Sequence, residues 1–231
     1  MKKLPISKLN DFFSAISKAG NKVYLPVDIG EGKGADYKLW EEGVELSKAL
    51  NTNRSAKDFF FPQTENLFEL KMDGKNIDVI DTRTEAEDFV VFGVRACDVR
   101  SFDILDRVFL ANPVDTYYKN RREHGVIISL ACTKPAHTCF CHQMDVDATN
   151  AGGDIQTWIA EDTLYLEALT EKGKALLAKV DFAEDADTKA VEAQKAETKK
   201  ALEALPLTMP SREIFEEKKL PEFSRKVVRV N

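Results

Sequence analysis

Two short β-branched runs, each leading into a cysteine, constrain the fold of this chain more than any other feature. FVVFGV spans residues 89–94 and GVIISLA spans 125–131, and such short apolar runs are typical of buried strands. Residues 98–110 between them predict a helix, with apolar positions at Val99, Phe102, Leu105 and Val108/Phe109. Strands joined in this way usually form a right-handed parallel crossover. We therefore predict an α/β fold (mixed α+β) with a central mixed sheet, a β-α-β unit at 89–131 and flanking helices.

The remaining segments supply further elements around this unit. SKLNDFFSAISKA (7–19) has a helical apolar stripe, and Gly20 is a helix-ending signal. NKVYLPVDI (21–29) is a predicted strand in which Pro26 favours a sheet edge. The other expected elements are a short helix at 45–50, a hairpin at 67–81 turning at Asp73-Gly74, strands at 154–160 and 163–169, and helices at 170–180 and 186–205.

Composition excludes some classes of function. The 33 Lys and Arg against 39 Asp and Glu give a net charge of −6, which argues against a nucleic-acid partner. No run of about 18 apolar residues is present, so no membrane span is expected. MKKLPISKLNDFF lacks the apolar core of a secretory signal, which favours a cytoplasmic location with reduced thiols. We expect one domain over 1–205 and, from the prolines that follow, an extended arm or linker over 206–231.

All four cysteines lie in one window, with the spacing C-x34-C-x6-C-x-C at Cys97, Cys132, Cys139 and Cys141. Disulfides and unrelated buried thiols are the simpler alternatives. Three cysteines within ten residues of loop-like sequence instead favour a metal or a cluster. Cys139 and Cys141 face the same way in an extended segment, and the Pro135 loop can bring Cys132 beside them.

The spacing by itself leaves the kind of site open. It lacks the paired C-x2-4-C knuckles of structural zinc, but three cysteines with His137 or His142 remain possible zinc ligands. Iron–sulfur clusters take four thiolates at variable spacings, as [4Fe-4S] or [2Fe-2S]. A thiol enzyme, with Cys139 or Cys141 as nucleophile, is a third alternative. Groups expected to surround a cluster without binding it are Arg95, Arg100, His137 and His142.

Three segments resemble one family, the iron–sulfur proteins grouped with the beta subunit of sulfhydrogenase and the A subunit of anaerobic sulfite reductase. The family pattern has G-V-R-x-C-D, a YY-x-x-RRE segment and C-T-x-P-x-x-T-C-F-C. This chain has GVRACD from Gly93, YYKNRRE from Tyr117 and CTKPAHTCFC from Cys132. The resemblance covers about residues 1–180, with similar residues at FFFPQ (59–63) and GGD (152–154).

The resemblance implies an electron-transfer component of anaerobic metabolism with an iron–sulfur cluster, [4Fe-4S] before [2Fe-2S], on the four cysteines. Its implied partners are a ferredoxin-like domain or protein, a catalytic oxidoreductase subunit of hydrogenase or sulfite reductase type, and a flavin- or NAD(P)-binding subunit. The C-x2-C-x2-C-x3-C repeats of the ferredoxin-like domain do not occur in these 231 residues. A zinc-stabilised interaction module without redox activity is the competing prediction.

Overall fold

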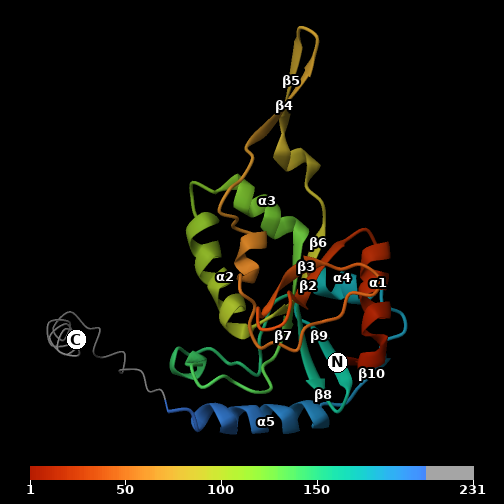
Figure 1. Ribbon diagram of the computed structural model, residues 1–231, viewed down its shortest axis with the longest axis vertical. Helices are drawn as coiled ribbons and strands as arrows, with labels where there is room; N and C mark the ends of the chain where they lie inside the picture. The colour runs from red at the N-terminus through yellow and green to blue at the C-terminus, as the bar shows by residue number, and fades with distance from the viewer. Residues whose placement is uncertain (207–231) are drawn as a thin grey trace, which may run out of the picture.

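A central eight-stranded sheet organises the protein, whose residues 1–206 we describe from a computed structural model. The strand order is β10-β1-β9-β8-β7-β6-β2-β3, and a separate two-stranded sheet holds β4 and β5. Strands β2, β6, β7 and β8 are parallel neighbours, and the outer strands pair antiparallel. The predicted mixed α/β fold is therefore confirmed (Figure 1).

The strands are β1 (Lys2–Pro5), β2 (Lys22–Asp28), β3 (Ala35–Leu39), β4 (Phe68–Asp73), β5 (Asn76–Asp81), β6 (Phe89–Val94), β7 (Gly125–Leu130), β8 (Ile155–Ala160), β9 (Thr163–Ala168) and β10 (Glu184–Asp185). The α-helices are α1 (Leu9–Lys18), α2 (Ala96–Phe109), α3 (Thr116–His124), α4 (Glu171–Leu177) and α5 (Lys189–Glu203). Short 3-10 turns are η1 (Ile6–Lys8), η2 (Ala56–Phe59), η3 (Thr82–Glu85) and η4 (Cys141–Gln143).

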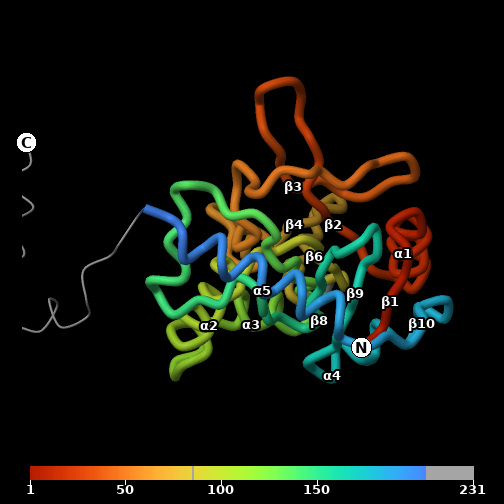
Figure 2. The backbone as a smooth tube through the Cα atoms, turned by 90° about the horizontal axis from the view of Figure 1, so that it is seen from below, coloured from red at the N-terminus to blue at the C-terminus, as the bar shows by residue number. Residues whose placement is uncertain are grey.

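Helices cover both faces of the sheet (Figures 1 and 2). Helix α1 buries its predicted stripe, Phe12, Phe13 and Ile16, against alternate residues of the strands on one face. On the other face, α2 and α3 pack Phe102 and Tyr118 against β6 and β7. Helix α5 covers Trp158 of β8 on that second face. Burial of each of these large apolar side chains contributes about 1.5–3 kcal/mol to the free energy of folding. This packing holds the helices against the sheet.

The β-α-β unit forms as predicted, with β6 and β7 paired in parallel, but it contains a second helix, α3, that the apolar pattern did not indicate. Helix α3 is largely polar, so it carries little apolar periodicity. Its signals are a cap and a charge: the Asp115 carboxylate accepts hydrogen bonds from the N–H groups of Tyr117 and Tyr118, and its last turn is basic.

The prediction that Pro26 lies on a sheet edge is wrong, because strand β2 lies between β6 and β3. Its parallel pairing with β6 ends at Tyr24, and the missing N–H of Pro26 therefore leaves no gap in that ladder. Gly93 faces the Pro26 ring: a Cβ on Gly93 would lie 3.1 Å from Pro26 Cδ.

The predicted helix at 45–50 is absent, and the segment is irregular. It lies over the strand ends because the N–H of Ser47 donates to the carbonyl of Pro26 at 2.8 Å. Contacts with β2 take the place of the backbone hydrogen bonds that a helix at 45–50 would make. The predicted tail after Pro206 lies outside the described residues, so the domain boundary there stays a prediction.

Candidate functional site: the cysteine end

The four cysteines gather where parallel strands end, and we call the start of α2 together with residues 131–150 the cysteine end. Cys97 is the second residue of α2, directly beyond β6, and Cys132 follows β7 by two residues. Cys139 lies in the loop that follows, and Cys141 opens η4. Figure 1 shows this green loop beside the first turn of α2. All four thiols are free; Cys97 is exposed and the other three are half-buried.

Backbone hydrogen bonds hold the loop at both of its ends. The Cys132 N–H donates to the carbonyl of Ala148 at 2.9 Å, which joins the beginning of the loop to its end. The Val146 N–H donates to the carbonyl of Cys141 at 3.1 Å, and the Thr198 hydroxyl of α5 donates to the carbonyl of Thr133 at 3.2 Å. The cysteines are therefore carried on a folded loop.

The thiols lie close enough to influence one another's ionisation. Burial raises the pKa of the Cys132 thiol to about 11, and the other three cysteines add to the rise while Arg95 opposes it. Burial also raises the pKa of Cys97, and Asp98 and Cys141 act in the same direction. Burial is again the main cause of the raised pKa of Cys141, with Cys139 adding to it.

Arg95 ties three segments together at this site. Its Nε donates to the carbonyl of Leu50 at 2.9 Å, and its terminal nitrogens donate to the carbonyls of Ala49, Leu130 and Ala131. The guanidinium thus holds the backbone that leads into Cys132 and places a positive charge near that thiol. Arg100 is placed differently: it is exposed and ion-paired with Asp103 at 2.7 Å.

The two loop histidines differ in burial. The Nδ1 atom of His142 is buried and has no hydrogen-bond partner in the described part of the chain, whereas His137 is exposed. A buried nitrogen without a partner is costly, so a partner from outside the protein chain is expected there. Among the hydrogen bonds within residues 1–206, none joins a cysteine thiol to a histidine ring, which leaves the thiol-enzyme alternative without support.

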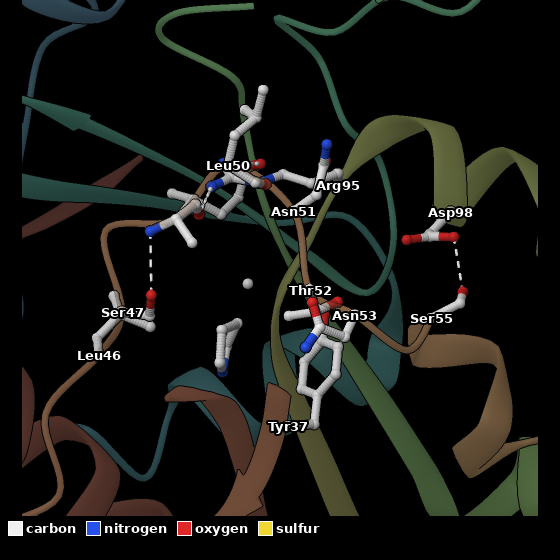
Figure 3. A pocket seen from close by; sticks show the side chains of 14 residues that line it. Tyr37, Leu46, Ser47, Leu50, Asn51, Thr52, Asn53, Ser55, Arg95 and Asp98 are labelled. Atoms are coloured by element: carbon white, nitrogen blue, oxygen red, sulfur yellow. Dashed lines mark hydrogen bonds between the residues drawn. The ribbon is translucent and has the colours of Figure 1, made fainter. Parts of the chain in front are cut away.

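A cavity of about 260 Å³ adjoins the site, at the ends of β2 and β6 (Figure 3). Arg95 and Asp98, which flank the Ala96-Cys97 pair, line it together with Tyr37. The Asp98 carboxylate accepts hydrogen bonds from Ser55 and Lys57, both at 2.7 Å. Burial and the charge of Asp98 raise the pKa of Tyr37, so its phenol stays protonated over the ordinary pH range.

Sequence reasoning missed Asp154 as a positioning residue. Its buried carboxylate accepts the N–H of Ile127 at 2.9 Å and the hydroxyl of Thr170 at 2.7 Å, which joins β7 to the start of α4. Gly152 and Gly153 precede it, both with positive φ. The signal was the GGD sequence itself, since adjacent glycines before an acid mark a turn that can aim a carboxylate at backbone donors.

No three His, Cys, Asp or Glu side chains within residues 1–206 lie close enough together to hold a single metal ion. The thiols are neighbours, but they do not form one four-ligand shell. Across the same residues, no helix is long and apolar enough to cross a membrane.

Comparison with known proteins gives a relative and no matching family model. The sulfhydrogenase 2 subunit beta of Pyrococcus furiosus is 32% identical to this chain over 148 residues, which is 63% of this chain and 41% of the relative. The chain therefore spans less than half the length of the curated relative that it matches. This similarity confirms the predicted resemblance to sulfhydrogenase beta-type subunits.

Proposed function

We propose that this homologue of a sulfhydrogenase beta subunit is an electron-transfer subunit, not itself catalytic, that binds one iron–sulfur cluster through Cys97, Cys132, Cys139 and Cys141. The observation that carries the proposal is the convergence of all four free thiols from α2, the end of β7 and one loop on the carboxyl edge of the sheet. That edge is where open α/β sheets bind ligands.

The residues fit an iron–sulfur cluster on three counts. Burial raises the pKa of the Cys97, Cys132 and Cys141 thiols, and bound iron would supply positive charge that favours their thiolates. Arg95 offers a fixed cation beside Cys132, and backbone N–H groups of Cys97 and Asp98 favour the thiolate of Cys97. The buried Nδ1 of His142 offers a hydrogen-bonding nitrogen next to Cys141.

The sequence spacing of the cysteines favours a cluster over zinc. The four cysteines lack the paired C-x2-4-C knuckles that are typical of structural zinc sites. Iron–sulfur clusters take four thiolates at spacings that vary between families, and C-x34-C-x6-C-x-C supplies four. We therefore propose [4Fe-4S], with [2Fe-2S] as the smaller alternative.

When bound, the cluster supplies reversible one-electron transfer. The residues of the chain would hold the cluster, influence its charge state and limit its contact with water. The four thiolates would fix the cluster on the loop and on α2, and Arg95 would favour the reduced, more negative state. The half-buried positions of Cys132, Cys139 and Cys141 would limit access by water.

The partners follow from the relative, which is described as a subunit of a sulfhydrogenase. We propose that electrons pass between a flavin- or NAD(P)-binding subunit, or a ferredoxin-like protein, and a catalytic oxidoreductase subunit, in the cytoplasm. The exposed side chains of Phe140 and Met144 beside the ligand loop offer an apolar surface for such a contact.

Anaerobic purification from cells supplied with both iron and zinc tests the proposal. The expected product is brown, holds about four iron and four sulfide per chain, and gives a low-temperature EPR signal after reduction. About two iron and two sulfide would assign the smaller cluster. Colourless protein with one zinc per chain would overturn the redox function in favour of a zinc module.

A further inference from the structure

The β4–β5 hairpin, residues 68–81, projects from the end of the molecule opposite the cysteines, and we call it the arm. Figure 1 shows it extending beyond α3, away from the main sheet. β4 and β5 pair only with each other, through a register from Phe68↔Asp81 to Asp73↔Asn76. Its base is held by the Tyr117 hydroxyl, which donates to the carbonyl of Leu67 at 2.8 Å.

One face of the arm is apolar and uncovered. The pairs Leu70↔Val79 and Met72↔Ile77 stand on the same face because cross-strand partners share a side of the ribbon. Five apolar side chains on this face are more than half exposed: Phe68 at 55%, Leu70 at 57%, Met72 at 73%, Ile77 at 59% and Val79 at 68%. Together they expose roughly 600 Å², the upper end of what a monomeric protein usually leaves open.

The opposite face and the tip of the arm carry charged side chains with a small acidic excess. The carboxylates there are Glu69, Asp73 and Asp78 against Lys71 and Lys75, whereas Asp81 lies opposite Phe68 and is ion-paired with Arg83. A two-stranded ribbon is at best marginally stable in water without a surface to pack against. A cover with an apolar centre and basic flanks would complement both properties of the arm.

The chain itself carries an exposed apolar strip with an arginine beside it, on the outer side of α2. The inner side of that helix packs Phe102 and Phe109 in the core, whereas Ile104 and Val108 are 57% and 62% exposed. Leu110 and Val114 extend the strip into the loop towards α3, and this loop lies at the arm end of the molecule (Figure 1). Arg107 is exposed beside Val108.

We propose that two copies of this chain dimerise by exchanging arms, so that the apolar face of each arm packs on the outer side of α2 of the other copy. The carboxylates of the arm would then have Arg107 as a partner of opposite charge. Covering both arms and both helix strips would bury on the order of 1,500–2,000 Å², the size of a standard specific interface. The exchange of arms therefore covers the apolar face of the arm and the apolar strip of α2 in both copies.

The arrangement leaves the cysteine ends free. The arm and the cysteine loop lie at opposite ends of the molecule (Figure 1), so a dimer joined at the arms would point both cysteine ends outward. The inference goes beyond the proposed function, because it concerns assembly and would hold for any role of the cysteines.

Light scattering after size exclusion tests the dimer with the full chain. Wild-type protein at micromolar concentration should have twice the 26.0 kDa mass of one chain. The double variant Leu70→Asp with Val79→Asp should be monomeric, because it places charges on the buried face. Lys71→Asp changes the net charge equally from the other face and should remain dimeric. If the double variant fails to fold, Met72→Asp places one charge on the same face, and Lys71→Gln, which also lowers the net charge by one, is its control.

A mixing experiment distinguishes arm-to-helix packing from arm-to-arm packing. Ile104→Asp with Val108→Asp on α2 should also be monomeric. Mixing this helix variant with the arm variant should restore a weak heterodimer, because one arm-to-helix contact stays intact. A dimeric helix variant would overturn the arm-to-helix contact. A monomeric wild type, including one that instead binds lipid vesicles or another protein, would overturn the proposal.

Discussion

The cysteine end and the arm end of the molecule differ in the kind of side chain that they leave exposed to water. The cysteine end keeps three of its four thiols half-buried, on a loop held by Arg95 and by backbone hydrogen bonds. The arm end leaves apolar side chains in the open on a ribbon that touches little of its own chain. The first arrangement suits a bound group that supplies charge, and the second suits a surface that excludes water.

This difference has an energetic consequence. Replacing a side chain at the cysteine end leaves buried partners unsatisfied, which is costly in the folded monomer. Replacing one on the arm disturbs little within the monomer, because exposed side chains contribute little to its folding free energy. Effects should therefore appear in folding and cofactor retention at one end, and in assembly at the other.

The largest expected effect is loss of the cluster from Cys141→Ser. Cys139 and Cys141 lie two residues apart, and removing one of four thiolates leaves an incomplete ligand set. Iron and sulfide analysis of anaerobic protein should show most of the cluster gone. The arm variant Val79→Asp serves as the control and should keep a full complement. Unchanged iron and an unchanged spectrum in Cys141→Ser would show that Cys141 is not a ligand.

Asp106→Asn should lower the free energy of unfolding by about 3 kcal/mol at pH 7, because it breaks the clamp between α2 and α3. The carboxylate of Asp106 accepts hydrogen bonds from Arg122 at 2.9 Å and from the Tyr118 hydroxyl at 2.6 Å. This clamp lies between the two ends, so its loss should weaken the common core. Urea denaturation measures the effect.

The same carboxylate predicts a pH dependence. Burial acts to raise the pKa of Asp106, but Arg122 and Tyr118 outweigh it and hold the pKa below the ordinary value of 3.8. The stabilisation is therefore complete above pH 3.8 and is lost as the pH falls through the lowered pKa. The gap between wild type and Asp106→Asn should close only in strong acid; a constant gap would contradict this explanation.

Arg95→Gln should cost about 2 kcal/mol of unfolding free energy, because four backbone carbonyls lose a charged donor. Arg100→Gln is the matched control: its exposed pair with Asp103 should contribute less than about 0.5 kcal/mol. Chemical denaturation of both variants measures the difference. Equal costs would mean that Arg95 does not organise the cysteine end.

His142→Ala should shift the reduction potential of the bound cluster by some tens of millivolts, since about 59 mV corresponds to a tenfold change for one electron. The buried Nδ1 of His142 is the reason to expect a contact with the cluster, and the exposed His137 is the control that should have no effect. Potentiometric titration followed by EPR gives both values. Loss of the cluster in either variant would argue for a histidine ligand.

The smallest expected effect is on the stability of the arm variants. Leu70→Asp with Val79→Asp should change the unfolding free energy of the monomer by less than about 0.5 kcal/mol, because both side chains are already exposed. Thermal unfolding at dilutions below the dimer's dissociation range measures it. A large loss there would mean that the arm packs on its own chain.

Local patterns predicted much of the fold and only part of the site. The runs at 89–94 and 125–131 and the stripe of α1 have strong periodicity, and each forms the expected element. Helix α3 was missed because its polar face carries no such period, and the helix at 45–50 was wrongly expected because contacts with Arg95 and β2 outweigh its weak local preference. Whether the four cysteines bind a cluster stays a prediction, although their placement at one sheet edge agrees with it.

The sequence alone determined the strands and helices with strong apolar periodicity and that the thiols follow two strands of one β-α-β unit, because hydrophobic periodicity and chain connectivity are local properties. Only the tertiary structure decided how Arg95 reaches four carbonyls, which histidine has a buried ring nitrogen, and that the hairpin at 68–81 stands away from the core. These features depend on contacts between residues far apart in the chain. The hairpin has the same alternating pattern as a core strand, and only its position shows that one apolar face lacks a partner.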